Sequence, residues 1–311
     1  MECPMKKERP RVVEASAVAD FGDLCGECPV WSVEENALEW IDCVGDNFLT
    51  IAWPSRKSRI SRKGVKISGF RRNRAGGYVI TNSQGVWLWD GAEKYGRLVH
   101  EVKGRPCQAN DCIADSAGRF ITATYYYNPA GSYELGSLIS VNGDGKVTVL
   151  DDGFHLANGL GFSPNGDRLY FADSAARLIF VYDYDVSSGV ACNRRILVKV
   201  PQNEGLPDGL AVDAEGCVWS AQWYGGCIVR YDPTGKLMQR VQIPAKQTSS
   251  LTFGGSDLTD IFVTSASQSE PMPIMPPGYD PASGTFGGAL YHLNLGITGL
   301  PQHLPNIGLC G

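Results

Sequence analysis

Several features that mark other protein classes are missing from this sequence of 311 residues. It contains no run of about 18 apolar residues, which excludes a transmembrane helix and a membrane partner. No apolar stretch of about 7–15 residues follows the charged N-terminal segment, so we recognise no secretory signal. We therefore expect a cytoplasmic protein.

A strongly basic surface is also missing. The formal net charge is −5, and only one basic run occurs, at residues 56–63, with Arg71, Arg72 and Arg74 close behind it. Nucleic-acid binding needs a clustered basic stripe on one face. This run is more typical of solvated hairpin ends beside a strand, so we expect no nucleic-acid partner.

Two further patterns are absent. No segment keeps a 3.6-residue apolar period, which predicts few helices. No Gly-x-Ser-x-Gly motif occurs, which argues against a serine hydrolase of the nucleophile-elbow type.

Cysteine is abundant, at ten residues, but its spacing is uninformative. Cys25 and Cys28 form a C-x-x-C pair, yet a zinc site would need a second such pair or a His pair at matching spacing. We interpret most cysteines as structural thiols, and a disulfide, a redox role or a metal role stays open for individual ones.

Glycine is in excess, at 37 residues, and it recurs in a repeated pattern. A turn such as Asp-x-x-Gly is followed by a short strand of aromatic and β-branched residues. The first strand residues of the six copies lie at 38, 78, 119, 169, 218 and 261. A period of about 40–50 residues with several strands in each repeat is typical of propeller blades.

The sequence therefore predicts an all-β fold, a six-bladed β-propeller with four antiparallel strands in each blade. We expect residues 12–21 to form a strand that completes the last blade beside residues 289–293, because such closure removes the open edges. The whole chain, 1–311, reads as one domain with a short extension at 1–11 and a Pro/Gly-rich loop at about 270–285. Such a domain would be a monomer or a weak homo-oligomer.

Four polar residues precede the blade turns by similar distances. Asn158 lies 11 residues before Leu169, and Asp208 lies 10 residues before Val218. The other two are Asn110, 9 residues before Arg119, and Glu27, 11 residues before Leu38. The innermost strands of a propeller line its channel, so these side chains are expected to share one level of it.

Carboxylate and amide oxygens suit a hard cation such as Ca²⁺, Mg²⁺ or Mn²⁺. The alternative interpretation is that Asn158-Gly159 and Asp208-Gly209 are simply turn dipeptides. The matching offsets in four repeats favour the cation site.

Several motifs then resemble the senescence-marker-protein/gluconolactonase/regucalcin-like family. They are Gly26-Glu27-Cys28-Pro29-Val30-Trp31, Asn158-Gly-Leu-Gly-Phe-Ser-Pro-Asn-Gly-Asp, Pro207-Asp208-Gly-Leu-Ala-Val-Asp and Ser249-Ser-Leu-Thr-Phe-Gly-Gly. The resemblance runs from about residue 14 to 293. It implies a six-bladed propeller with one divalent metal ion, whose ligands match Glu27, Asn158 and Asp208, while Asn110 matches a residue that contacts substrate or completes the metal shell.

Three positions depart from that family pattern. Gln108 stands where the family often has Arg, and Cys112 stands where it often has Gly. Tyr125-Tyr126-Tyr127-Asn128 occupies a stretch where sugar-lactonase relatives often carry an acidic residue. These changes leave the implied metal ligands intact and put the usual sugar substrate in doubt.

The resulting hypothesis is a divalent-metal-dependent hydrolase that opens a small lactone. Asp208 would be both ligand and catalytic base, and Ca²⁺ is the expected ion, with Zn²⁺, Mg²⁺, Mn²⁺ or Fe²⁺ as alternatives. The predicted substrate contacts are Asn110, Gln108, Asp111, Asn128 and Tyr127. Two alternatives stay open: a broader metal-dependent aryl- or phospho-esterase, and a calcium-binding protein without enzymatic activity.

Overall fold

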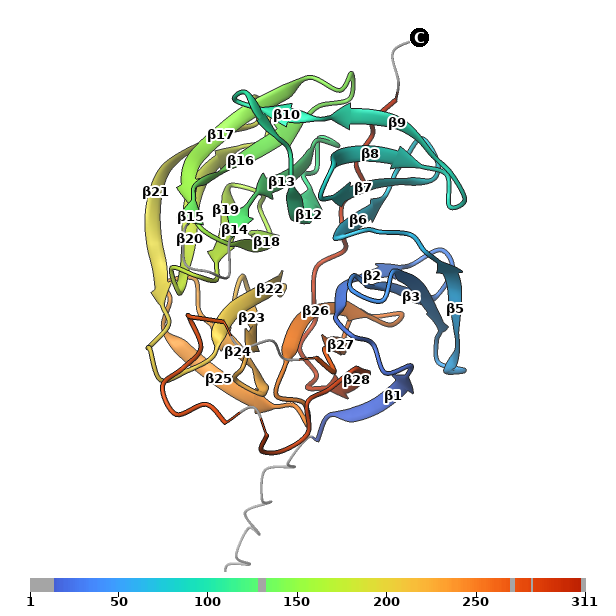
Figure 1. Ribbon diagram of the computed structural model, residues 1–311, viewed down its shortest axis with the longest axis vertical. Helices are drawn as coiled ribbons and strands as arrows, with labels where there is room; N and C mark the ends of the chain where they lie inside the picture. The colour runs from blue at the N-terminus through green and yellow to red at the C-terminus, as the bar shows by residue number, and fades with distance from the viewer. Residues whose placement is uncertain (1–13, 128–132, 269–271, 281, 309–311) are drawn as a thin grey trace, which may run out of the picture.

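The computed structural model describes residues 14–127, 133–268, 272–280 and 282–308. Within these residues every regular element is a β-strand, and no helix occurs. Six four-stranded antiparallel sheets stand around a central axis (Figure 1). The prediction of an all-β, six-bladed propeller is therefore confirmed.

The first three blades follow one another along the chain, each beginning with its innermost strand. Blade 1 is β2 (Gly26–Ser32), β3 (Ala37–Asp42), β4 (Asn47–Ala52) and β5 (Lys57–Lys63). Blade 2 is β6 (Gly69–Arg72), β7 (Tyr78–Asn82), β8 (Gly85–Trp89) and β9 (Lys94–Val99). Blade 3 is β12 (Ala109–Ala114), β13 (Phe120–Thr124), β16 (Gly136–Val141) and β17 (Val147–Phe154).

The other three blades repeat this order, except that the last one borrows a strand from the N-terminal region. Blade 4 is β18 (Ala157–Phe162), β19 (Arg168–Asp173), β20 (Leu178–Asp185) and β21 (Val190–Lys199). Blade 5 is β22 (Leu206–Val212), β23 (Val218–Trp223), β24 (Cys227–Tyr231) and β25 (Leu237–Gln242). Blade 6 is β26 (Thr248–Gly254), β27 (Asp260–Ser265), β28 (Ala289–Asn294) and β1 (Ser16–Asp20).

Two small ribbons lie outside the blades. They are β10 (Glu101–Val102) with β11 (Arg105–Pro106), and β14 (Tyr126–Tyr127) with β15 (Tyr133–Glu134).

Closure of the ring is made by β1, which pairs antiparallel with β28 from Ser16↔His292 to Asp20↔Ala289. The predicted closing strand is thus confirmed, with shorter bounds than 12–21. The extension predicted at 1–11 lies outside the described residues.

The repeated turns form as their sequences dictate. In blade 3 the Gly118 amide donates to the Asp115 carbonyl at 3.0 Å, and in blade 5 the Gly216 amide donates to the Asp213 carbonyl at 2.9 Å. Both glycines have positive φ, 87° and 81°, which side chains with a Cβ rarely adopt. Each turn therefore needs its glycine to join an inner strand to the next one.

Blades adhere to one another through large buried side chains, among them Trp40, Trp89 and Trp219. The indole of Trp219 also donates to Asp213 Oδ2 at 2.8 Å, so its polar atom is satisfied. A buried aromatic ring of this size removes about 150–250 Å² from water, a contribution of about 4–6 kcal/mol to the gross burial energy. The ring is held together mainly by this apolar packing between sheets.

The chain does not end with blade 6. Residues 300–308 leave it and run past the axis toward blades 2 and 3, as the red segment in Figure 1 shows. The Asn73 side chain brackets Ile307 with two hydrogen bonds, donating to its carbonyl at 2.8 Å and accepting from its amide at 3.1 Å. Ile307 is fully buried in the cluster shared by blades 1 to 3. This tail therefore closes one end of the channel, an element that the repeat pattern did not predict.

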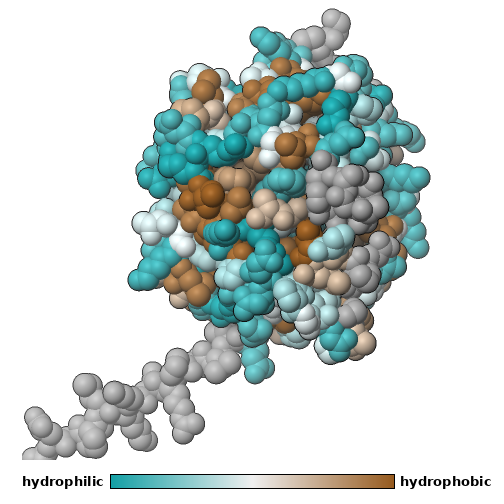
Figure 2. Space-filling view, turned by 60° about the vertical axis from the view of Figure 1, so that its left-hand side comes forward, coloured by the Kyte–Doolittle hydropathy of each residue, from teal (hydrophilic) through white to brown (hydrophobic). Residues whose placement is uncertain are grey.

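The face seen in Figure 2 mixes hydrophilic and hydrophobic residues. Among the described residues, no helix has the length and apolar character that crossing a membrane requires.

Between Ser265 and Ala289 the described residues form turns and no strand. Arg177 of blade 4 donates to the Ile274 carbonyl in this segment at 2.9 Å.

Candidate functional site

Inner strands that carry the predicted site residues share one irregularity. In β22 the pairing with β23 steps from Pro207↔Gln222 to Leu210↔Ser220, so three residues oppose two. The same one-residue bulge occurs in β2, β12 and β18. The inner strand of blade 6, β26, carries no predicted site residue and also shifts by one residue, between Thr248 and Ser250, while β6 of blade 2 pairs without any shift. A bulge bends its strand and redirects a side chain.

Each predicted polar residue lies within such a bulge. Glu27 begins the shift in β2, and Asn110, Asn158 and Asp208 each lie one residue into the shifts of β12, β18 and β22. The constant offset seen in the sequence thus corresponds to a bulge at the same level of four inner strands.

The glycines after two of these residues are required by close packing. A Cβ on Gly159 would lie 2.3 Å from the Leu210 amide nitrogen, and one on Gly209 would lie 2.1 Å from Ser250 Oγ. Both dipeptides lie inside strands, not in turns. Asn-Gly and Asp-Gly are used here because neighbouring inner strands approach closely beside the site.

Amide side chains link blades 3, 4 and 5 at this level. Asn110 Nδ2 donates to Asn158 Oδ1 at 2.8 Å and to the Ala157 carbonyl at 2.9 Å. Asn158 Nδ2 donates to Ser174 Oγ at 2.9 Å, and that hydroxyl donates to the Pro207 carbonyl at 2.6 Å. The Asn158 oxygen keeps one lone pair for a further partner, because an amide oxygen has two. The orientation of the Asn158 amide is therefore fixed by Asn110 at its oxygen and by Ser174 at its nitrogen.

Two carboxylates face this network from blades 1 and 5. Asp208 is only 5% exposed, and its buried Oδ1 has no hydrogen-bond partner in the part of the chain that the structure describes. Burial, and next the charge of Asp111, raise the pKa of Asp208 well above its usual range. Burial, and next the charge of Asp208, do the same to the pKa of Glu27. The ionised form of each carboxyl group is therefore unfavourable here unless a positive charge meets it.

An unpartnered buried carboxylate oxygen is costly unless a charge or donor meets it. Two carboxylates and an amide oxygen form an all-oxygen donor set, the kind that hard divalent cations prefer. The residues present fit such an ion, and Glu27, Asn158 and Asp208 would hold it.

The structure places the predicted substrate residues as follows. Gln108 is half-buried just before β12, and Asp111 lies in β12 directly after Asn110. Burial raises the pKa of Asp111, against the lowering effects of Arg71 and of the Cys112 amide, which donates to Asp111 Oδ1 at 2.7 Å. Tyr127 belongs by its backbone to β14, and Asn128 lies outside the described residues.

Sequence reasoning missed what lies on the other side of these predicted ligands. A cavity of about 160 Å³ continues down the channel. It is lined by residues within the bulges, such as Cys28 and Asp111, by residues at the ends of the bulges, such as Leu160 and Leu210, and by the tail at 300–303. It also missed Ser174, which directly follows Asp173, the last residue of β19. No repeat offset marks the tail, so no signal placed it.

Comparison with known proteins identifies a matching family and relatives that cover most of this chain. The sequence profile of the SMP-30/Gluconolactonase/LRE-like region matches residues 25–267. Pentonolactonase XacC of Haloferax volcanii is 32% identical over 305 residues, covering 94% of this chain and 98% of that protein. Regucalcin of Danio rerio is 36% identical over 245 residues, covering 78% of this chain and 82% of its own.

A solved structure of a luciferin-regenerating enzyme has a similar fold. It superposes with a TM-score of 0.82 at 26% identity, and the match covers 94% of this chain and 99% of that one. The four inner strands that carry the predicted site residues lie within the stretch that the sequence profile matches.

Proposed function

Because this chain belongs to the SMP-30/gluconolactonase/LRE-like family, we propose that it is a divalent-metal-dependent lactonase acting at the bulged end of the channel. The family and the pentonolactonase relative support lactone hydrolysis in general. The metal dependence, the roles of single residues and the preferred lactone are the parts that we propose.

One observation carries the metal dependence. Within the described residues, Asp208 Oδ1 is buried without a hydrogen-bond partner beside the half-buried carboxylate of Glu27, and bulges in four inner strands hold these groups and two amides at one level. A cation of charge +2 would compensate both carboxylates. We propose Ca²⁺ as that ion, held by Glu27, Asn158 and Asp208.

A bound divalent ion supplies positive charge that polarises an ester carbonyl and acidifies water. The remaining steps belong to side chains of this chain. The Asp208 carboxylate takes the proton of the attacking water as that water adds to the lactone carbonyl. The ring C–O bond then breaks, the released alkoxide takes that proton from Asp208, and a hydroxy acid leaves with Asp208 again ionised.

The amides and Gln108 orient the substrate in this proposal. Asn110 is locked against Asn158 and Ala157, so its position is fixed before a ligand arrives. Gln108 offers one neutral donor group and one acceptor, whereas an arginine would offer a charged fork. We therefore propose weaker selection for anionic sugar lactones, with Asp111, Tyr127 and Asn128 as further contacts.

A pH-indicator assay over a lactone panel tests this function. The panel contains pentono- and hexono-lactones, an uncharged aliphatic lactone, an aryl ester and a phosphotriester, each with Ca²⁺, Mg²⁺, Mn²⁺ or Zn²⁺ and with chelator. We expect acid release from at least one lactone, lost with chelator and restored by metal. When Asp208→Asn is measured in the same assay, Asp144→Asn is its matched control, because Asp144 is an exposed turn residue.

Other outcomes have distinct meanings. Faster turnover of the aryl ester or phosphotriester than of every lactone would replace the lactonase with the broader esterase. Calcium binding with no hydrolysis of any panel member would leave a calcium-binding protein without enzymatic activity. Hydrolysis that chelator does not affect would contradict the metal dependence.

A further inference from the structure

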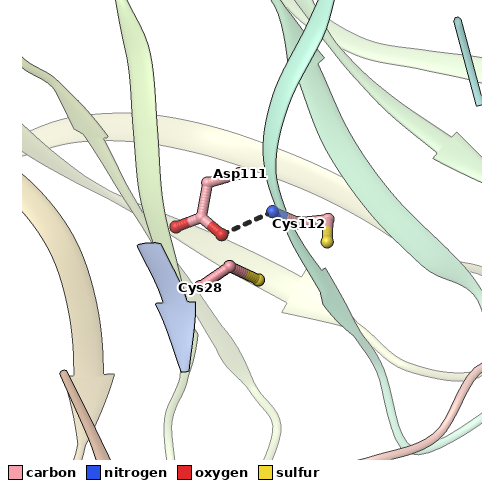
Figure 3. Close-up of side chains that lie close together, drawn as sticks. All are labelled: Cys28, Asp111 and Cys112. Carbon is pink, nitrogen blue, oxygen red and sulfur yellow. Dashed lines mark hydrogen bonds between the residues drawn. The ribbon is translucent and has the colours of Figure 1, made fainter. Parts of the chain in front are cut away.

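Two buried cysteines meet beside the channel cavity. Cys28 lies in the bulge of β2, and Cys112 lies in β12. Their Sγ atoms and a carboxylate oxygen of Asp111 all lie within 4.8 Å of one another (Figure 3). Cys28 is 3% exposed and Cys112 is fully buried. Residues from blades 1 and 3 thus form one thiol pair across the inner edge of blade 2.

Such a trio resembles a soft-metal site, but Arg71 already supplies the positive charge. Its Nη1 lies 3.1 Å from Cys28 Sγ and 4.0 Å from Cys112 Sγ, and it donates to the Phe70 carbonyl at 2.7 Å. Arg71 is buried, and β6 that carries it pairs without a bulge, so the guanidinium is firmly placed. A metal ion about 2.3 Å from both sulfurs would compete with it for the same space.

The two sulfurs differ in access. Cys28 lines the cavity of about 160 Å³, whereas Cys112 does not. About 10–15 Å³ of such cavity volume holds one water molecule, so hydrogen peroxide, which is only slightly larger than water, has room in the cavity. An oxidant entering there meets Cys28 first, with Cys112 behind it.

We propose that Cys28 and Cys112 form a reversible disulfide when the protein meets hydrogen peroxide. Cys28 attacks one peroxide oxygen, the O–O bond breaks, and the thiol becomes a sulfenic acid with release of one water molecule. Cys112 then attacks the Cys28 sulfur, the S–O bond breaks, and a second water molecule leaves as the S–S bond forms. Two thiols are oxidised and one peroxide is reduced.

The cross-link changes the geometry beside the proposed ligands. The sulfurs must approach to about 2.05 Å, so the two side chains, or the strands that carry them, must move. Cys28 directly follows Glu27 and has a φ of +48°, a left-handed conformation that is costly for a residue with a Cβ. The disulfide itself does not depend on the proposed lactonase activity, and its test uses no substrate.

Mass spectrometry of the full chain tests the proposal. The reduced protein is treated with hydrogen peroxide, alkylated under denaturing conditions and digested. We expect a mass loss of about 2 Da before alkylation, one peptide pair that joins Cys28 to Cys112, and full reversal by dithiothreitol. In Cys112→Ser, Cys28 should stop at the sulfenic acid and react with dimedone.

Cys25→Ser is the matched control, because Cys25 lies three residues from Cys28 and its carbonyl accepts from the Cys43 amide at 2.9 Å. This variant should keep the Cys28–Cys112 cross-link. In the wild-type protein, a cross-link from Cys25 to Cys28 or Cys43 in place of the Cys28–Cys112 cross-link would overturn the proposal. So would alkylation of both Cys28 and Cys112 after peroxide, or a zinc ion that binds stoichiometrically and protects both thiols.

Discussion

The two ends of the central channel are built in opposite ways. At one end, bulges in four inner strands gather Glu27, Asn110, Asn158 and Asp208, and the buried Asp208 Oδ1 has no hydrogen-bond partner among the described residues. At the other end, the tail fills the opening, with Ile307 fully buried and bracketed by Asn73. The first end gives up local stability for a charged site, and the second restores packing where the ring would otherwise stay open.

This difference indicates a division of labour within one channel. Unsatisfied buried charge is typical of sites that await a ligand, because it costs free energy in the empty protein. Satisfied tail contacts instead add burial and hydrogen bonds. Variants at the first end should alter chemistry, and variants at the second should alter stability.

Asp208→Asn should produce the largest effect, on activity. The amide keeps an oxygen but cannot accept the proton of the attacking water. We expect kcat on the preferred lactone to fall by about 10²–10⁴-fold at saturating metal. Unfolding monitored by fluorescence should show no loss of stability, because the variant removes a buried negative charge. Full recovery of kcat with excess metal would show that Asp208 is a ligand only.

Ile307→Ala should produce the largest effect on stability. Truncating a fully buried isoleucine leaves a cavity in the cluster shared by blades 1 to 3, at a cost of about 2–5 kcal/mol. Urea unfolding measures it, with Leu237→Ala as control because Leu237 is 51% exposed. Metal affinity should stay unchanged. If Ile307→Ala is as stable as Leu237→Ala, the tail does not stabilise the fold as proposed.

Gly209→Ala should affect both stability and metal binding, and so tests whether the two can be separated at this end of the channel. The added Cβ would meet Ser250 Oγ at 2.1 Å and Ser250 Cα at 2.7 Å, which forces apart the inner strands of blades 5 and 6. We expect a loss of about 1–3 kcal/mol in unfolding free energy, together with weaker metal binding. Gly308→Ala is the control, because no atom lies within 4 Å of its Cβ position.

Gln108→Arg should have the smallest effect and should act on substrate choice alone. A charged fork adds an attraction for anionic or polyhydroxylated rings, worth about tenfold in kcat/KM. Stability and metal binding should not change. If the ranking of lactones in the panel stays the same, position 108 does not read the substrate.

Much of this arrangement was predictable because propeller repeats convert sequence offsets into spatial layers. Leu169 and Val218 mark equivalent strands, so Asn158 and Asp208 could be placed at one level without coordinates. The closing strand was predictable from alternation near residue 16. The bulges were not predictable from the sequence. A bulge adds one residue to the distance between a polar residue and its blade turn, and that distance already varies by as much from blade to blade.

The tail and the thiol pair escaped prediction for another reason. Ile307 and Asn73 are 234 residues apart and belong to no repeat, so only the folded ring brings them together. Cys28 and Cys112 are also far apart in sequence, and the C-x-x-C spacing pairs Cys28 with Cys25 rather than with Cys112. Contacts across the ring depend on closure, and no local pattern encodes them.

The metal content of purified protein tests the central claim most directly. Wild-type protein, Glu27→Gln and Asp208→Ala are dialysed against the same calcium buffer, and bound metal is measured by elemental analysis. The account predicts one ion per chain in the wild type and a clear loss in both variants, with the fold retained in each. Equal occupancy in all three proteins would contradict it.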